Sequence, residues 1–362
     1  MDDLSFQMQE TLEVISMMRD RELRYIPRHY VSALHSHERG EEVDDSLIDG
    51  KCRQVLVEWC YRVVDHYAIP RHVVATAMNF VDRFCSRHKC DRDALKLVTT
   101  TSLFLSLKLF QGNYECRSGF EVDYEQGGYS LNVSKVLPSL TNGQYSAGHI
   151  SRFETVLIQS LGFFVNPPLP ARYLDEYLNL LPLSGLKSFV DTPTCFSGSI
   201  FRQRLMAKSQ FFTELAVVES SLLSALPSLV GLACVLNALR LTQQQHLINK
   251  DKQRNKSCII TALPSEKPKS DHIIDEFETS SNFLKSIILS QNSSSKSDIQ
   301  LNCMFTSCTQ EQDQLYHLRR IQDILWDAYE DHTHTEITQS MKHQEAQIRN
   351  SPTSVVADGS FL

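Results

Sequence analysis

Glycine is scarce in this sequence, at 13 of 362 residues, and several catalytic motifs are missing altogether. Parallel sheets that carry phosphate-binding loops usually need more glycine, and no Gly-rich phosphate loop is found. The sequence also has no Gly-x-Ser-x-Gly, His-Glu-x-x-His or Cys-x-x-Cys motif. The residues therefore offer no recognisable active site, and we expect no cofactor and no metal. This favours a binding protein over an enzyme.

An excess of positive charge and a long apolar segment are missing as well. The formal net charge is −7, whereas nucleic-acid binding needs a basic footprint. The best candidate for a membrane span, 220–239, is cut by Pro227, which leaves too few residues on its C-terminal side to cross a bilayer. We therefore expect neither nucleic acid nor a membrane as a partner.

The ten cysteines do not form a recognisable framework. The N-terminal MDDLSFQ is acidic and lacks the apolar stretch of a secretory signal, so we expect most of the cysteines to be reduced thiols. Cys85 and Cys90 lie five positions apart, a spacing that gives only a weak ligand signal.

Apolar residues recur at helical spacing along most of the chain. Over residues 51–67 they recur at i, i+3, i+4, i+7 and i+8, which predicts an amphipathic helix. No long stretch alternates apolar and polar residues in the manner of a half-buried strand. We predict an all-α protein with helices over 2–24, 51–67, 70–86, 91–110, 144–161, 171–181, 199–226, 227–241 and 310–330.

Proline-rich and polar stretches divide the chain into two tandem helical units. The segment NPPLP (166–170) predicts a stiff connector, and residues 111–129 predict a surface loop. In the C-terminal tail, Ser351 precedes a proline and is a candidate phosphorylation site. We expect an N-terminal helix and linker (1–45), a first unit (46–165), a looser second unit (166–242, with 310–330 as a candidate addition), a disordered insertion (243–309) and a flexible tail (331–362).

Two groups of charged residues interrupt the apolar helices. Lys108 stands in the run SLFLSLKLF (102–110), although an ammonium group seldom stays buried without a partner. It either extends along its own stem to water or lies where another molecule meets it. Asp82 and Arg83 are adjacent on a helix, where side chains diverge by about 100°, so we expect them to tie helices together rather than to form one catalytic site.

Four stretches, in this order and spacing, resemble the cyclin box. They are CRQVLVEW (52–59), AMNFVDRF (77–84), the stretch from Leu97-Val98 to Ser106-Leu107-Lys108, and Phe153-Glu154 with Leu161-Gly162-Phe163. The resemblance covers about residues 46–165, and 169–241 resemble the second box of the family more loosely, best at Leu226-Pro227-Ser228. The stretch at 77–84 leans toward D-type or other G1-type cyclins.

The resemblance implies a tandem cyclin fold and a regulatory subunit without catalysis of its own. Such a subunit binds and activates a cyclin-dependent Ser/Thr protein kinase in cell-cycle control, by holding the αC helix of the kinase inward. It also implies a location in the nucleus, the cytoplasm or both. An alternative is a cyclin-fold scaffold in transcription, resembling transcription-associated cyclins or B-type general transcription factors. The net charge of −7 and the absence of Cys-x-x-Cys disfavour the latter.

The resemblance also implies which residues meet the kinase. Lys108 and Glu154 match a lysine and a glutamate that clamp the kinase backbone, each charge-assisted bond contributing about 1.5–3 kcal/mol. Ile158 and Phe163 match the apolar part of that interface, and Leu109, next to Lys108, is a further candidate contact. Leu109-Phe110-Gln111 departs from the acidic residues that relatives often place there.

A second surface of the family recruits substrates with Arg-x-Leu motifs. The added positive charges of Arg62 and Lys96 should repel an arginine-bearing peptide here. The residues that match this surface form an apolar stripe on the helix predicted at 51–67: Cys52, Val55, Leu56 and Trp59. The alternative is that these four residues have a structural role in the core.

Overall fold

The computed structural model describes residues 2–31, 48–110, 122–123, 128–129, 144–181, 197–257, 270–290 and 311–349. These residues confirm the all-α prediction, and the strands β1 (Val122–Asp123) and β2 (Gly128–Tyr129) form only a two-residue antiparallel pair. The helices are α1 (Asp2–Glu22), η1 (Leu23–Tyr25), α2 (Gly50–His66), α3 (His72–Cys85), α4 (Arg92–Phe110), α6 (Ala147–Ser160), α7 (Pro170–Leu180), α8 (Ser197–Val218), η5 (Ser220–Leu222), α9 (Pro227–Ser257), α10 (Ser270–Ser290) and α11 (Glu311–Arg349).

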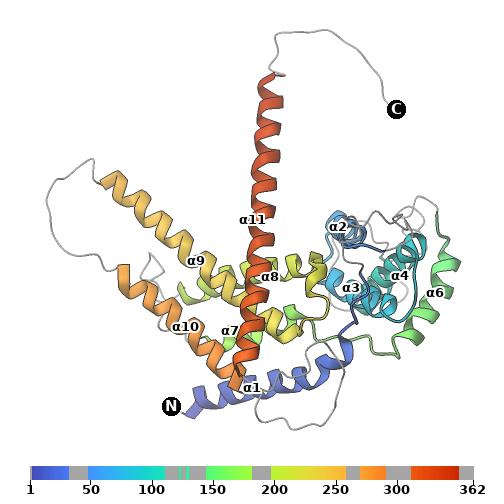
Figure 1. Ribbon diagram of the computed structural model, residues 1–362, viewed down its shortest axis with the longest axis horizontal. Coiled ribbons are helices and arrows are strands. Elements are labelled where there is room, and N and C mark those ends of the chain that lie inside the picture. Colours follow the sequence, from blue (N-terminus) through green and yellow to red (C-terminus); the bar gives the residue numbers. More distant parts are fainter. Residues whose placement is uncertain are drawn as a thin grey trace, which may run out of the picture.

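The described helices form two large cores and a small cluster around Phe104 and Ile150. Figure 1 shows α2, α3, α4 and α6 grouped on one side of the molecule, and α7 to α11 on the other. In the first unit α4 is central, packed between α3 and α6, as its almost uninterrupted run of apolar and small residues predicts. Some small polar residues of α4 are hydrogen-bonded: Thr99 Oγ1 donates to the Leu95 carbonyl one turn back and Ser106 Oγ donates to the Val73 carbonyl of α3, both at 2.8 Å, whereas the buried hydroxyls of Thr101 and Ser102 have no hydrogen-bond partner among the described residues.

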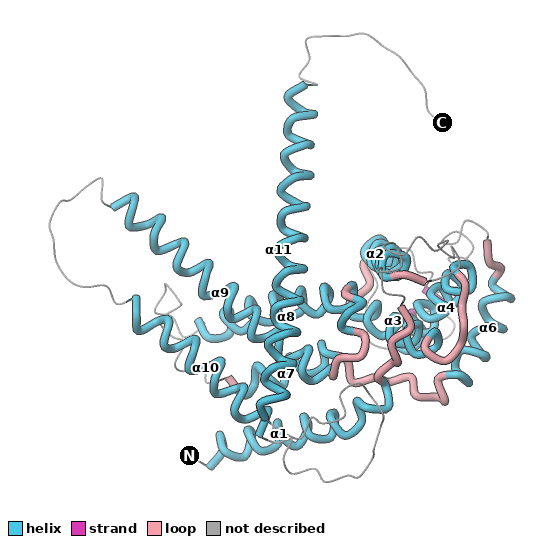
Figure 2. Tube along the Cα trace, viewed as in Figure 1, coloured by secondary structure: helices cyan, strands magenta, loops and turns pink. Residues whose placement is uncertain are grey.

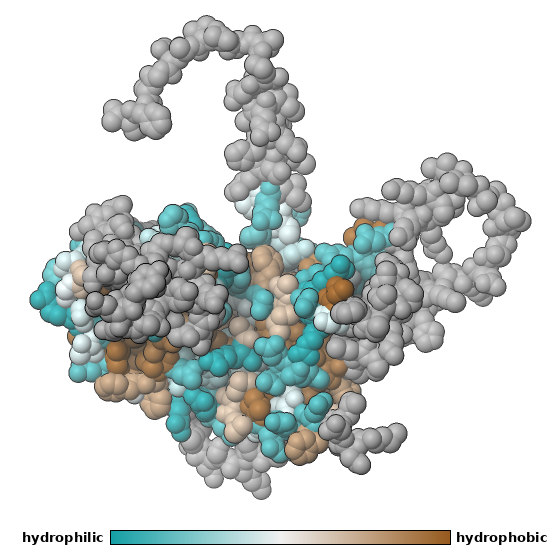
Figure 3. Space-filling model, turned by 180° about the vertical axis from the view of Figure 1, so that it is seen from behind, coloured by the Kyte–Doolittle hydropathy of each residue, from teal (hydrophilic) through white to brown (hydrophobic). Residues whose placement is uncertain are grey.

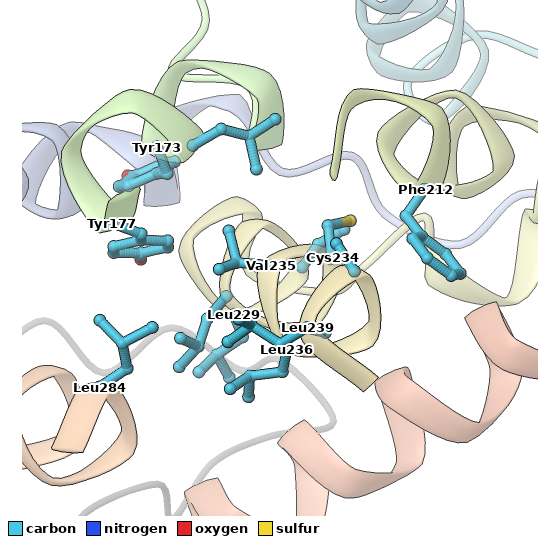
Figure 4. Packing of buried hydrophobic residues seen from close by; sticks show 14 of the residues in the cluster. Tyr173, Tyr177, Phe212, Leu229, Cys234, Val235, Leu236, Leu239 and Leu284 are labelled. Carbon is cyan, nitrogen blue, oxygen red and sulfur yellow. The ribbon is translucent and has the colours of Figure 1, made fainter. Parts of the chain in front are cut away.

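The core of the second unit surrounds α9. Tyr173 and Tyr177 of α7 stack at 5.7 Å and face the aliphatic side chains of α9 (Figure 4). The two helices approach closely at Gly231, where an added Cβ would lie 2.9 Å from the Pro170 carbonyl oxygen. Glycine is therefore needed here for packing.

Helix α1 lies against the second unit, although the first unit follows it in sequence. Ile15 is fully buried in the second core. At the end of α1, the Glu22 carboxylate accepts hydrogen bonds from the Ser228 backbone N–H (2.8 Å), the Ser228 hydroxyl (2.8 Å) and the Tyr173 hydroxyl (3.1 Å). It thus occupies the N-terminus of α9, where the helix dipole favours an anion. Burial nonetheless raises the pKa of Glu22.

A buried cation joins the two units. The Arg53 guanidinium of α2 pairs with Asp82 of α3 through two 2.9 Å hydrogen bonds, and its third nitrogen donates to the Val217 carbonyl of α8 at 2.7 Å. Tyr30 also donates to Asp82, at 2.7 Å. Nearby, Arg71 pairs with Glu214 of α8 at 2.8 Å. The units therefore meet through α2, α3 and α8, which adjoin in Figure 2.

The C-terminal half is more helical than the sequence predicts. The proposed disordered insertion at 243–309 is wrong over two stretches, because α9 continues to Ser257 and α10 buries Leu284, Ile288 and Leu289 in the second core. The polar residues around α10 mask its short apolar stripe. Helix α11 likewise extends through the expected flexible tail as far as Arg349, and α8 ends at Val218 rather than at 226.

Some sequence predictions fall outside the described residues. These are the polar linker before α2, most of the 111–129 loop, the remainder of the proposed insertion and Ser351.

Candidate partner-binding site

Lys108 and Glu154 meet where α4 passes α6. Lys108 Nζ lies 2.8 Å from Oε2 and 3.0 Å from Oε1 of Glu154. The same ammonium lies 4.2 Å from the centroid of the Phe104 ring, within range of a cation–π contact. The Lys108 side chain is 42% exposed and that of Glu154 is 12% exposed. Lys108, the lysine in the apolar run, therefore reaches the protein surface and is paired there with Glu154.

This ion pair retains hydrogen-bonding capacity. An ammonium group has three donors, and a carboxylate has about four acceptor positions, so the two mutual contacts satisfy neither group completely. The exposed side of Lys108 can donate to a further carbonyl, and Glu154 can accept from a further amide. The pair is chemically suited to grip a polypeptide backbone from two directions.

Helix α6, which carries Glu154, is held firmly in place. Ser146 caps its start by accepting from the His149 N–H at 3.3 Å, and Ile150 and Leu157 are fully buried. At its end, Arg83 donates to the Leu161 carbonyl at 2.9 Å and to the Phe164 carbonyl at 2.7 Å. Burial, followed by repulsion from Arg87, lowers the pKa of Arg83 to about 10. Asp82 and Arg83 are thus ties between separate elements, as predicted.

Phe163 is the most exposed large apolar side chain of the molecule's described part, at 72%. It follows Gly162 in the turn after α6, and both residues have φ near +62°. A non-glycine residue in this region carries strain of about 1–3 kcal/mol. The hydrogen bond from the Phe163 N–H to the Ile158 carbonyl, at 3.1 Å, holds the turn. The structure therefore keeps an aromatic ring in water on a strained backbone.

The other apolar residues predicted for this site differ in exposure. Leu109, next to Lys108, is 44% exposed, whereas Ile158 is half-buried and packs on the first core. Val156 of α6 is 49% exposed and Phe164 is 43% exposed; no motif in the sequence marked them. Figure 3 shows hydrophobic surface gathered at the end of the molecule where α6 lies.

The second predicted patch lies along the N-terminal half of α2. Val55 is 52% exposed, and the other three members are half-buried at the edge of the core. Burial raises the pKa of the Cys52 thiol, and the nearby cations Arg92 and Lys96 act against that rise. Lys96 also pairs with Asp93 at 2.9 Å. The predicted apolar stripe therefore divides into a surface part (Cys52, Val55, Leu56 and Trp59) and a core part (Cys60, Val63 and Val64).

The described residues show no group of three or more His, Cys, Asp or Glu side chains placed to hold a metal ion. Within the same residues, no helix combines the length and apolarity that a membrane crossing requires.

Comparison with known proteins finds a similar domain family for the first half of the chain. Residues 13–166 match the family model "Cyclin, N-terminal domain". Among curated relatives, the putative cyclin-F3-1 of Oryza sativa subsp. japonica is 24% identical over 54% of this chain and 42% of its own length. Cyclin-A2 of Xenopus laevis is 25% identical over 53% of this chain and 38% of its own length. The chain thus spans about two-fifths of the length of these relatives.

A solved viral cyclin from herpesvirus saimiri aligns over 78% of this chain and 87% of its own, with a TM-score of 0.40 and 11% identity. The match over residues 13–166 and the named relatives of the A and B types make this part of the chain similar to a cyclin N-terminal domain. The lean toward D-type or other G1-type cyclins is not supported.

Proposed function

We propose that this chain is a regulatory subunit that binds and activates a cyclin-dependent Ser/Thr protein kinase in cell-cycle control, without catalysis of its own. The observation that carries the proposal is the Lys108–Glu154 pair, set between two helices of a cyclin N-terminal domain. The pair lies at the surface and keeps unused donors and acceptors. The proposed place of action is the nucleus, the cytoplasm or both.

The polar part of the proposed interface is a backbone clamp. Lys108 donates to carbonyl groups of the kinase, and Glu154 accepts from its amides. When the partner excludes water, each such charge-assisted bond strengthens, because the local dielectric falls. The mutual ion pair holds both side chains in place beforehand, which limits the entropy lost on binding.

The apolar part of the proposed interface is formed by Leu109, Ile158 and Phe163. Phe163 offers the largest exposed surface, and burial of an aromatic ring at the centre of an interface commonly dominates its energy. The strained turn after α6 fixes the ring outside the fold of its own chain. Strain at an exposed aromatic residue supports a role in binding.

The kinase would be activated because the Lys108–Glu154 clamp holds it at a particular position. A protein kinase is active only when a lysine on strand β3 pairs with a glutamate of its αC helix. A rigid subunit that packs beside αC and holds it inward favours that pair. The firm anchoring of α6 by Ile150, Leu157 and Arg83 suits this role, since a mobile helix would transmit little bias.

The proposal includes a substrate-docking role for the α2 patch, formed by Cys52, Val55, Leu56 and Trp59. Val55 supplies exposed apolar surface there. Two cations, Arg92 and Lys96, and one anion, Asp49, lie near enough to influence the Cys52 thiol, so an arginine-bearing peptide meets more positive than negative charge. We expect an apolar peptide without arginine to bind better than an Arg-x-Leu peptide, in a titration followed by fluorescence anisotropy.

Affinity capture of the tagged full chain from its source cells tests the proposed function. We expect a cyclin-dependent kinase among the captured proteins, and we expect the purified kinase to phosphorylate a protein substrate faster when the chain is added. If no protein kinase is captured, or if a captured kinase is not activated by the chain, the proposed function is wrong.

A further inference from the structure

Two thiols lie in contact at the turn between α3 and α4. Cys85 is the last residue of α3 and is only 7% exposed, whereas Cys90 is half-buried and lies two residues before α4. Their sulfur atoms are 3.9 Å apart, and the Cys85 thiol donates toward Cys90. The Cys90 thiol in turn points to the His88 carbonyl, at 3.5 Å. The weak spacing signal in the sequence thus corresponds to a real pair of neighbouring sulfurs.

The turn between the two cysteines permits a closer approach. A disulfide bond requires a sulfur–sulfur distance of about 2 Å, so the two sulfurs must move together by roughly 2 Å. The Arg87, His88 and Lys89 side chains are exposed, so the turn can shift at the surface, where Arg87 and His88 contact Ser160 and the His88 ring lies 4.5 Å from that of Phe84. Because Cys85 ends a helix and Cys90 precedes the next, closure changes the turn rather than either helix.

We propose that Cys85 and Cys90 form a dithiol modification site that a hydroperoxide oxidises to an intramolecular disulfide. In the first step the Cys90 thiolate attacks one peroxide oxygen, the O–O bond breaks, and the released alkoxide takes up a proton. Cys90 is then a sulfenic acid. In the second step Cys85 loses its proton and attacks the Cys90 sulfur, and the S–O bond breaks with release of water. The two thiols lose two electrons, and the peroxide is reduced to an alcohol and water, or to two waters when the peroxide is hydrogen peroxide.

The surroundings assign the order of these steps. Acceptance of the hydrogen bond from Cys85 lowers the pKa of the Cys90 thiol, which favours its reactive thiolate form. Donation of that bond, together with burial, raises the pKa of Cys85. Cys90 is also the more accessible of the two. Cys90 is therefore the attacking residue and Cys85 is the resolving residue.

The turn also contacts the end of α6. Arg87 donates to the Ser160 carbonyl, and His88 Nε2 lies 2.8 Å from the Ser160 hydroxyl. Phe84, next to Cys85, packs edge-on against Phe153 at 5.5 Å. Closure of the disulfide therefore takes place against the helix that carries Glu154, although the modification itself does not depend on the proposed kinase partner.

Peptide mapping after oxidation tests the site. The full chain is treated with hydrogen peroxide, alkylated and digested without reductant. We expect a cross-link between Cys85 and Cys90, with a mass lower by two hydrogen atoms than that of the reduced form. Dithiothreitol should reverse it. Cys90→Ser should abolish this cross-link and leave Cys85 as a free thiol. Cys52→Ser, a half-buried cysteine outside the pair, should leave the cross-link unchanged.

Two outcomes would overturn the proposal. One is oxidation of Cys90 to sulfinic acid with Cys85 still reduced, which would show that the resolving step fails. The other is a disulfide between Cys90 and a different cysteine in place of Cys85. The far-ultraviolet circular dichroism of Cys90→Ser establishes that the variant is folded, and Cys85→Ala in the same assay should accumulate the Cys90 sulfenic acid.

Discussion

Arg53 and Asp82 form a bidentate ion pair in which the side chains are only 3% and 6% exposed. Burial by itself disfavours the charged guanidinium, but Asp82 outweighs it and raises the pKa of Arg53. The remaining nitrogen of Arg53 reaches α8 of the second unit. This charged pair thus holds α2 to α3, and Arg53 also contributes to the contact between the two units.

Removal of Asp82 tests the strength of this pair. Asp82→Ala leaves a buried guanidinium without its counter-charge, and we expect a loss of about 3–5 kcal/mol in the free energy of unfolding. Asp65→Ala is the control, because its pair with Arg71 is 41% and 49% exposed and should contribute less than about 1 kcal/mol. Urea unfolding followed by circular dichroism measures both. Equal losses would show that burial of the pair is not what matters.

Two glycines in helices should respond in opposite ways to alanine. At Gly231 the new Cβ would lie 2.9 Å from the Pro170 carbonyl and 3.1 Å from Tyr173 Cβ. We expect Gly231→Ala to destabilise the second unit by about 1–3 kcal/mol, since backbone must move. At Gly148 the nearest atom is 4.0 Å away, so Gly148→Ala should be neutral or stabilising. Thermal unfolding of the two variants compares them, and a stable Gly231→Ala would contradict the close contact of α7 and α9.

Glu22 should make stability depend on pH. Burial raises its pKa above the ordinary value of 4.5, so the unfolded chain releases this proton at a lower pH than the folded chain does. Its contribution to stability is therefore complete below pH 4.5 and is lost as the pH rises through the folded pKa. We expect Glu22→Gln to remove this component. The measurement is the melting temperature of both proteins at several pH values. If the melting temperature of the variant depends on pH as that of the unaltered protein does, the role of Glu22 is wrong.

Helix positions in the first unit could be predicted from sequence because periodicity is local. The predicted 51–67 and 91–110 correspond to Gly50–His66 and Arg92–Phe110. The buried state of Arg53 could not be predicted, since its partner Asp82 lies in another helix. The docking of Ile15 on the second core likewise depends on tertiary contacts.

The candidate site shows the same division. The resemblance to the cyclin box selected Lys108 and Glu154, and the structure places them in contact. From periodicity alone, Lys108 is interpreted as an ordinary exposed lysine at the end of a helix. The positive φ of Phe163 arises from the exit of the chain from α6 and has no signature in the residue itself, apart from the preceding Gly162. Backbone strain of this kind is set by the path of the chain.

Phe163 should contribute to partner binding and little to folding. Because its side chain is 72% exposed, Phe163→Ala should leave the melting temperature nearly unchanged. We expect its affinity for the kinase to fall by about thirtyfold or more, as for an interface residue that contributes at least about 2 kcal/mol. Phe6→Ala is the matched control, since Phe6 of α1 is 69% exposed and lies outside the proposed interface. A similar small loss in both variants would exclude Phe163 from the interface.

The most direct measurement is the affinity of the double variant Lys108→Ala/Glu154→Ala for the captured kinase, by isothermal titration calorimetry. We expect binding to be lost while the helical circular dichroism spectrum persists. The control is Asp93→Ala/Lys96→Ala, which removes an exposed ion pair from the same helix α4 and should bind normally. Normal binding and kinase activation by the Lys108→Ala/Glu154→Ala variant would contradict the proposed clamp.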